Sequence, residues 1–428
     1  MEEKRQSVLT RNGACLLSSA LLNTIPVGFI NVVPLVYLAQ IGYDPSVIGA
    51  IYSASAIALS VGLIPFGVLA DRYSRKRLLI VGTLVPAVSY VIFGLTLNPV
   101  WLIIASAIGG IGYAGGLASA VVTPALIPML AGSTSDSRRP TLFAFLQGSW
   151  AVAFIVGSLL SLLPDVLRSV FGLSDLMAHS ESYFIMAGVV VLSVAPLFLI
   201  EEKRDSDRHH EDVSDSAGNS SHAKSNGAEP APSGSRNSWM SPSWLNVLKF
   251  TSIYLLLGLG LGVLVQLLPT WYALQYGATE SSIGVWMAVS NLGTLFSIPI
   301  IPRLVRRWGV VGTASATGVV AACLLALMPL SSTFEMAALL YVIRGVAYGV
   351  SWATLQSHMT GIVVDKERAK MVGFAYTAWG VGAFAGTFIG GEMLGLEFLA
   401  LPFGAGVVCY LASSAALPIL FRSPKRAE

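Results

Sequence analysis

Long apolar runs fill nearly the whole chain, and short polar segments separate them. A helix needs about 20 apolar residues to cross the hydrocarbon core of a membrane, and most of these runs reach that length. The runs are continuous, whereas the strands of a membrane barrel alternate apolar and polar side chains over about 10 residues. The pattern therefore predicts twelve membrane-spanning helices, at residues 14–39, 47–70, 78–97, 100–129, 142–163, 183–200, 245–271, 282–302, 310–330, 336–363, 371–394 and 397–421.

The composition agrees with a chain that lies mostly in lipid. Of the 428 residues, 54% are hydrophobic and 11% are charged. Soluble domains carry about 25% charged residues, so this chain lacks the polar surface that a water-soluble protein needs. We predict an all-α membrane protein with many spans, and not a soluble enzyme with a single anchor.

The positions of lysine and arginine predict the orientation, because loops on the cytoplasmic side carry an excess of these residues. With both termini inside, every Lys and Arg lies on that side except Arg168, in an outer segment, and Arg344, within a span. An even number of spans agrees with this placement. We predict a multi-pass protein of the cytoplasmic membrane with both termini in the cytoplasm.

One long polar segment, residues 201–244, separates two parts with six predicted spans each. It is rich in Ser, Gly, Pro and charged residues, so it cannot bury enough apolar surface to offset the entropy of ordering. We predict an N-terminal bundle over 1–200, a flexible cytoplasmic linker over 201–244 and a C-terminal bundle over 245–428. Glycine-marked long spans and basic loops recur at corresponding places in the two parts, which indicates an internal repeat.

A short motif joins the second and third predicted spans. It reads Gly67-Val68-Leu69-Ala70-Asp71-Arg72-Tyr73-Ser74-Arg75-Lys76-Arg77. The motif resembles the G-x-L-a-D-R-x-G-R-[RK] signature of the major facilitator superfamily, with Ser74 at the second glycine. The loop at 302–309 is a degenerate echo of it in the second part. The resemblance implies two six-helix halves related by a pseudo-two-fold axis, with substrate bound between them near the middle of the membrane.

The resemblance also implies a role for the motif. In the family, the acid of the signature holds the halves together at their cytoplasmic edge in the outward-facing state, against the start of helix 11. That region corresponds here to residues 370–373. The implied conformational latch, which is not a substrate site, consists of Gly67, Asp71, Arg72 and Arg75.

Three ionisable residues within the predicted spans are candidates for binding substrate or for coupling transport to protons: Arg344, Glu392 and His358. Burying a cation in a membrane costs at least about 2.5–3.5 kcal/mol on insertion scales, so such a residue usually faces a cavity or a partner. A structural tie of Arg344 to backbone carbonyls or to Glu392 is the alternative. The family's helix-4 arginine corresponds here to Ser106, so the resemblance does not extend ordinary proton coupling to this chain.

The remaining titratable residues offer few further candidates. His358 is the only histidine that the prediction places within a span. No Asp or Glu is predicted near the middle of a span, and four acids fall at outer edges: Asp44, Glu280, Glu335 and Glu397.

Polar and aromatic residues within the spans predict the lining of a cavity. Each of them alone is more often an interhelical hydrogen-bonding or interfacial residue. Together they indicate a neutral pocket of amide and aromatic groups, for which the candidates are Asn23, Asn31, Gln147, Trp150, Gln266, Asn291, Gln356 and Trp379.

Nothing in the sequence marks an enzyme. The chain has no phosphate-binding loop with the glycine and lysine spacing of an ATP-driven pump. Cys15, Cys323 and Cys409 lie singly, without metal-ligand or disulfide spacing. We expect no cofactor, no metal site and no nucleic-acid partner. The expected partners of a monomeric chain are a small-molecule substrate and the lipid bilayer, and a role for protons stays open.

We therefore predict a secondary active transporter that moves a small organic solute across the cytoplasmic membrane by alternating access. The leading hypothesis is efflux of amphipathic or drug-like compounds, on the grounds of the motif at 67–77, the apolar and aromatic cavity, and the lack of recognisable sugar-binding signatures. The alternative is an uptake permease or a pH-independent facilitator for a metabolite, including an anion attracted by Arg344. A membrane sensor that transports nothing is disfavoured by the short termini and the lack of a folded signalling domain.

Overall fold

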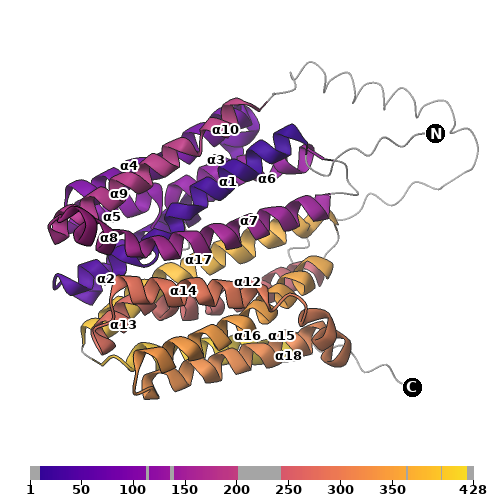
Figure 1. Ribbon diagram of the computed structural model, residues 1–428. Helices are drawn as coiled ribbons and strands as arrows, with labels where there is room; N and C mark the ends of the chain where they lie inside the picture. The colour runs from indigo at the N-terminus through magenta and orange to yellow at the C-terminus, as the bar shows by residue number, and fades with distance from the viewer. Residues whose placement is uncertain are drawn as a thin grey trace, which may run out of the picture.

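The computed structural model describes residues 10–111, 115–134, 139–200, 242–362, 365–396 and 398–421. The regular structure in these ranges is helical, and it forms two bundles that lie side by side (Figure 1). The N-terminal half contains α1 (Arg11–Ile30), α2 (Val33–Gln40), α3 (Pro45–Arg72), α4 (Arg75–Leu95), α5 (Pro99–Gly109), α6 (Gly116–Gly132), α7 (Arg139–Leu159), η2 (Leu160–Leu162), α8 (Leu163–Phe171), α9 (Asp175–Leu192) and α10 (Ala195–Phe198). The C-terminal half contains α12 (Pro242–Val263), η3 (Val265–Leu267), α13 (Leu268–Tyr276), α14 (Glu280–Leu295), α15 (Ile301–Leu327), η4 (Met328–Leu330), α16 (Phe334–Gly361), α17 (Asp365–Gly395) and α18 (Leu401–Leu420).

These helices account for the predicted membrane crossings. Ten helical segments in the described ranges are long and apolar enough to cross a membrane. The fourth predicted span is divided into the shorter apolar helices α5 and α6, and the eighth is the 16-residue α14. The predicted fold class, an all-helical membrane protein with two six-helix halves, is confirmed.

Besides the divided fourth span, two others are broken within their length. The first breaks between α1 and α2, where Pro34 follows, and the seventh breaks at η3, where Pro269 follows. Proline lacks a backbone N–H, so a helix interrupted there loses fewer hydrogen bonds. Irregular backbone at membrane depth is tolerated where protein surrounds it. Both breaks lie at the contact between the two halves, described below.

Two predicted boundaries are wrong. The sixth span begins at Asp175 and not at 183, because the Ser174 hydroxyl caps the start of α9 by accepting from the Met177 N–H. His358 is therefore not the only histidine in a span, since His179 lies in α9. The loop predicted at 302–309 is part of α15, which bends at Gly309, where φ is +70°.

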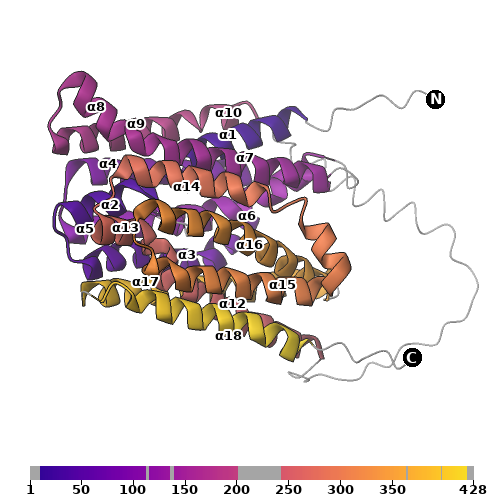
Figure 2. The same cartoon turned by 60° about the horizontal axis from the view of Figure 1, so that its bottom comes forward.

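The linker predicted at 201–244 lies outside the described residues as far as residue 241, and α12 begins at Pro242. The helices α1 and α12 begin, and α3 and α18 end, at the same end of the molecule (Figures 1 and 2). We call this the basic end, because Arg72 and the arginines of the 302–309 segment lie there. The other end, where α2, α8 and α13 lie, is called the opposite end.

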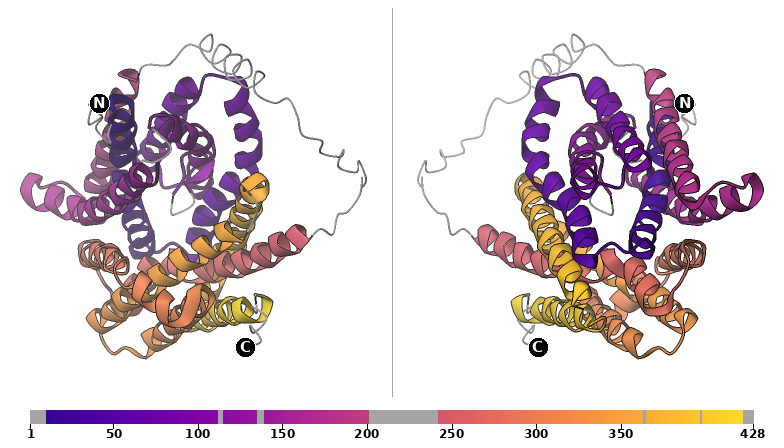
Figure 3. Two further views of the ribbon diagram at one scale, coloured as in Figure 1. Left: turned by 90° about the vertical axis from the view of Figure 1, so that its right-hand side faces the viewer. Right: turned by 90° about the vertical axis from the view of Figure 1, so that its left-hand side faces the viewer.

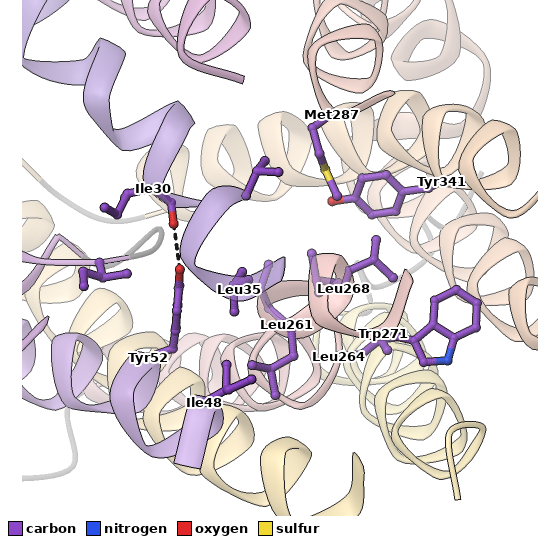
Figure 4. Packing of buried hydrophobic residues seen from close by; sticks show 14 of the residues in the cluster. Ile30, Leu35, Ile48, Tyr52, Leu261, Leu264, Leu268, Trp271, Met287 and Tyr341 are labelled. Atoms are coloured by element: carbon purple, nitrogen blue, oxygen red, sulfur yellow. Dashed lines mark hydrogen bonds between the residues drawn. The ribbon is translucent and has the colours of Figure 1, made fainter. Parts of the chain in front are cut away.

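One apolar core runs through both halves, and Figure 4 shows part of it. Leu35 and Ile48 of the N-terminal half and Leu264 and Leu268 of the C-terminal half are buried in the same cluster. Tyr52 is fully buried there, and its hydroxyl donates to the Ile30 carbonyl oxygen at 2.6 Å, close to the break between α1 and α2. A shared core of this kind keeps the halves together.

Candidate functional site: the contact between the two halves

Glycines of α3 and α17 bring the two halves together at the opposite end. The two helices lie against each other (Figure 3). A Cβ atom added to Gly391 would lie 2.8 Å from the Cα of Gly49, which is closer than real Cβ atoms approach. Next to this contact, the Ser46 N–H donates to the Asp44 carboxylate at 2.8 Å and lowers the pKa of Asp44. The backbones therefore meet at a distance that only glycine permits.

The same two helices separate toward the basic end. The contacts run from Gly49 with Gly391 to Ser60 with Gly380, so the helices are antiparallel and in register. Seven residues further along each helix, Gly67 would stand opposite Gly373. A Cβ atom added at either glycine would contact nothing within 4 Å. The separation develops over about 10 Å of helix, at 1.5 Å per residue.

A second pair of helices closes the opposite end in the same way. A Cβ atom added to Gly284 of α14 would lie 2.4 Å from the Ser158 carbonyl oxygen of α7. Between the broken spans, the Thr270 hydroxyl of α13 donates to the Leu35 carbonyl oxygen of α2 at 3.0 Å. Both halves thus contribute backbone and side-chain contacts to the closure.

Three predicted cavity residues, Asn31, Gln266 and Asn291, line one narrow space between the halves. The other lining residues are Val32, Phe154, Ser158, Val265, Pro269 and Met287. The space totals about 340 Å³, of which about 10 Å³ admits the centre of a water molecule. That is room for about one water, so this space is too narrow to hold an organic solute. Gln266 accepts from the Thr387 hydroxyl at 2.9 Å, and its amide nitrogen is buried without a partner among the described residues.

An aromatic wall lies in the C-terminal half, on the basic-end side of this narrow space. We use this name for Tyr254 of α12, Trp352 of α16, and Tyr376 and Trp379 of α17. The Trp352 ring centroid lies 5.5 Å from that of Tyr254, 6.3 Å from that of Tyr376 and 6.5 Å from that of Trp379. Along α17, Tyr376 and Trp379 fall between Gly380, which touches α3, and Gly373, which does not. The wall therefore stands at the depth where the halves begin to separate.

Polar groups accompany the aromatic wall. The Gln356 amide donates to the Tyr376 hydroxyl. The Tyr254 hydroxyl and the Trp379 indole N–H are buried and have no hydrogen-bond partner among the described residues. A buried polar group without a partner is costly. Flat apolar surfaces beside free donors suit a solute with a ring and hydrogen-bond acceptors. The predicted candidates Gln356 and Trp379 are thus brought together here.

Three other cavity candidates lie elsewhere. The Asn23 amide donates to the Thr83 carbonyl oxygen at 3.2 Å and joins α1 to α4 within the N-terminal half. Gln147 is exposed on α7, and Trp150 packs against the apolar cluster of the N-terminal half.

Arg344 is enclosed by tyrosines and is 3% exposed. Its guanidinium carbon lies 4.6 Å from the Tyr348 ring centroid, 5.3 Å from that of Tyr410 and 5.5 Å from that of Tyr341. It also donates to the Tyr410 hydroxyl at 2.7 Å. Aromatic faces attract cations most strongly where water is excluded, which explains how the membrane tolerates this charge. Tyr348 in turn stacks on Trp352, so Arg344 lies behind the aromatic wall.

The structure does not bring Arg344, His358 and Glu392 together. His358 lies 14 residues from Arg344 on α16, or about 21 Å along the helix at 1.5 Å per residue. Its ring is near those of Phe250 and Phe421 at the basic end. Glu392 is exposed on α17.

The latch predicted from the motif lies at the basic end, where α3 ends. Arg72 is exposed and Arg75 is half-buried at the start of α4. The side chain of Asp71 is outside the described residues, as are the side chains at 363–370. The register of α3 and α17 continues from Gly67 and Gly373 to place Asp71 level with residue 369. Near this level, a Cβ atom added at Gly67 or Gly373 would contact nothing within 4 Å.

A histidine and an acid join the two halves at the opposite end, and the sequence did not single out this pair. His179 of α9 lies 2.9 Å from Glu280 of α14, measured from Nε2 to Oε1. The side chains are 2% and 5% exposed. The signal that was available is the cap sequence at Ser174, which makes residues 175–182 helical and places His179 within a span.

A larger hollow of about 720 Å³ also lies at the opposite end, but it belongs to the C-terminal half alone. Since no described residue of the N-terminal half lines it, it is not the space between the halves. Its walls are formed by Trp271, Gln275, Pro329, Phe398, Leu399, Ala400, Leu401, Gly404 and Ala405.

Comparisons with solved structures agree with this architecture. The nucleoside transporter NupG is 15% identical, with a TM-score of 0.69 over 95% of this chain and 99% of that one. A bacterial homologue of the human lysosomal transporter Spinster, in an inward-facing and unoccupied conformation, is 14% identical, with a TM-score of 0.63 over 97% of this chain and 99% of that one. A POT family transporter in complex with 5-aminolevulinic acid is 14% identical, with a TM-score of 0.68 over 98% of this chain and 97% of that one. At these identities the similarity shows the fold.

Comparisons of the sequence bear on the family directly, whereas the similar structures show only the fold. No curated protein matches the chain. The family model described as Major Facilitator Superfamily matches residues 15–248 and 250–428, which is nearly the whole chain. The chain therefore belongs to the major facilitator superfamily, and it is a membrane transporter of that type.

Proposed function

We propose that this protein exports small amphipathic organic compounds by alternating access, and that it binds them against the aromatic wall. The observation that carries the proposal is the place of Tyr376 and Trp379 on α17, between the helix contact at Gly380 and the separated position at Gly373. A solute that enters from the basic end reaches these rings before it meets the closed contact. With the basic end in the cytoplasm, as the positive charges predict, the wall is loaded from inside the cell.

The wall favours substrates that are flat and carry little charge. Its aromatic faces suit apolar rings, and the Tyr254 hydroxyl and Trp379 N–H, buried without a partner among the described residues, would donate to acceptors on a solute when the wall opens to admit it. None of the four wall residues is an acid or a base. The membrane-enclosed cation Arg344 is covered by three tyrosines, so an anion reaches it only if those rings move.

A second candidate is facilitated uptake of a polar heterocycle. The two unpartnered donors beside the rings of the wall favour it. The rings can stack on the face of a heteroaromatic compound, and the donors can bond the acceptors at its edge. The similarity to a nucleoside transporter in fold is compatible with this candidate.

Flux into and out of proteoliposomes would separate the candidates. The panel consists of amphipathic cations, neutral aromatic drugs, nucleosides, sugars and organic anions, each with and without a pH gradient of either sign. Export of amphipathic compounds against their gradient is the expected result. Equilibration of nucleosides without regard to pH would support the second candidate. Movement of sugars or anions alone would contradict both, and no flux of any compound would support a sensor.

The latch gives a prediction at the basic end. We expect Asp71→Asn to slow transport about five- to tenfold and to leave substrate binding intact. A carboxylate near the start of a helix stabilises it by about 0.3–1 kcal/mol when exposed and by up to about 2 kcal/mol when partly buried. The carboxylate of Asp71 would gain this interaction with the neighbouring helix only when the basic end closes. Flux and equilibrium binding measured on the same preparation check this.

Glu181→Gln is the matched control for Asp71→Asn, since it neutralises an exposed carboxylate elsewhere on the N-terminal half. Transport by this control should equal that of the unmodified protein. If Asp71→Asn transports at the normal rate, the motif has no latch function here.

A further inference from the structure

His179 and Glu280 form a buried contact of ionisable side chains that crosses between the halves at the opposite end. The two residues are 101 positions apart, on α9 and α14. The Nε2 atom of His179 lies 2.9 Å from Oε1 and 3.1 Å from Oε2 of the carboxyl group. The Tyr37 ring of α2 stacks on the imidazole, with centroids 3.7 Å apart and planes at 16°. These neighbours shield the pair from water.

The hydrogen bonds of His179 determine how many protons the pair holds. Its Nδ1 atom lies 2.8 Å from the Asp175 carbonyl oxygen. A carbonyl oxygen only accepts, so Nδ1 carries a hydrogen. The lone pair of Nε2 would then face the carboxylate oxygens of Glu280, which also only accept when ionised. The contact at 2.9 Å therefore requires one more proton, on Nε2 or on the carboxyl group.

The other charged groups around the pair belong mostly to the N-terminal half. Arg168 of α8 bridges the carboxylates of Asp165 and Asp175, and the Ser281 hydroxyl of α14 donates to Asp165. The Asp175 carboxylate lies 3.8 Å from His179 Nδ1. The hydroxyl groups of Tyr37 and Tyr183 also interact with Glu280, and Glu181 is exposed on α9.

In the described part of the C-terminal half, α16 packs against α14 and its charged residues lie apart from the pair. On α16, Glu335 is exposed and Arg344 is enclosed by its tyrosines. On α7 of the N-terminal half, which also packs against α14, the described side chains from Leu142 to Leu159 carry no charge.

We propose that His179 and Glu280 form a proton-binding site between the halves, and that the opposite end closes only when this site holds one proton. The proton comes from the compartment that the opposite end faces, which the distribution of positive charge predicts to be the outside. This inference rests on the alternating access of the proposed function, because the pair must separate when the opposite end opens.

The direction of the pH dependence follows from counting protons. In the open state both side chains are in water, where the pKa of histidine is about 6.5 and that of glutamate about 4.3. Between these values the separated pair already holds one proton, so closing takes up none. Above about pH 6.5 the separated pair has lost that proton, and closing must take one up. The ratio of closed to open molecules therefore falls by up to tenfold per pH unit above about 6.5.

The experiment measures closure directly and does not depend on flux. Cys15, Cys323 and Cys409 are first replaced by alanine. Spin labels are then placed at Phe171 and Leu330, which are exposed at the opposite end on different halves. Distances between the labels are measured from pH 5.5 to pH 8.5 on the full chain in lipid nanodiscs, where both faces meet one pH. The closed distance should give way to a longer one as the pH rises.

Glu280→Gln tests the pair specifically. An amide can accept from a protonated imidazole or donate to a neutral one, so the contact survives without a required proton. The closed fraction should then change less than twofold across the range. Glu335→Gln, at an exposed carboxylate of the same end, should keep the normal pH profile.

Two results would overturn the proposal: distances that are the same at pH 5.5 and 8.5 in the unmodified protein, or a normal pH profile in Glu280→Gln. The first result needs no substitution at the pair, so it holds even if Glu280→Gln does not fold. A protein that closes as the pH falls but transports no compound would contradict the carrier function and leave the proton site standing. Transport by a protein whose closure does not depend on pH would support the carrier function and contradict the proton site.

Discussion

Replacing Gly391 with valine is expected to reduce transport at least tenfold while the protein still folds and inserts. The added Cβ would lie 2.8 Å from the Cα of Gly49 and 2.8 Å from the Pro45 carbonyl oxygen. These are backbone atoms, which cannot rotate away. Overpacking of a tight contact typically costs about 1–3 kcal/mol, and here the cost falls only on the state in which the opposite end is closed. Flux and the spin-label distances across the opposite end check this.

The control is Gly404→Val. Gly404 also lies in a membrane helix of the C-terminal half, but an added Cβ there would contact nothing within 4 Å. It should transport normally. Gly391→Val should show mainly the longer, open distance between the labels. Normal flux through Gly391→Val would mean that the contact of α3 with α17 is not required for closure.

The second large effect is expected at the aromatic wall. Trp352→Ala should raise the apparent KM for aromatic substrates about tenfold. Trp352 contacts the rings of Tyr254, Tyr376 and Tyr348, and an aromatic pair contributes about 0.5–1.5 kcal/mol beyond its buried area. Removing the indole takes away a stacking surface and loosens the neighbouring rings. Trp352→Phe should retain most of the affinity, since it keeps a flat ring.

Trp101→Ala is the control for this effect. Trp101 is 54% exposed on α5, away from the wall, and its loss should leave the KM unchanged. The melting temperature of each variant distinguishes a weaker site from a less stable fold. If Trp352→Ala binds every substrate as well as the unmodified protein does, the substrate lies elsewhere between the halves.

Arg344 illustrates how far helical periodicity reaches. The sequence identifies it as a buried cation that needs partners. Tyr341 and Tyr348 lie three and four residues away on the same helix, where side chains share one face. The third partner, Tyr410, is 66 residues away on α18 and is brought there by packing. The enclosure that separates Arg344 from the space between the halves depends on that third ring.

His179 illustrates the opposite case. The segment at 175–182 contains acids, serines and a histidine, so hydropathy places it outside the membrane. It becomes helical because Ser174 caps it, and it is buried because Tyr37 and Glu280 cover it. Neither neighbour is close in sequence, and Glu280 belongs to the other half.

The sequence by itself determined the spans, the two-part organisation and the family. These are properties of single segments: each helix in lipid must satisfy its own backbone and present apolar side chains, and the motif at Gly67–Arg77 is contiguous. Tertiary structure alone decided which glycines of α3 and α17 meet and which stand apart, which rings form the aromatic wall, and that His179 reaches Glu280. Each of these depends on helices from distant parts of the chain. Their register and separation are set when the helices pack together, and no local pattern of residues encodes them.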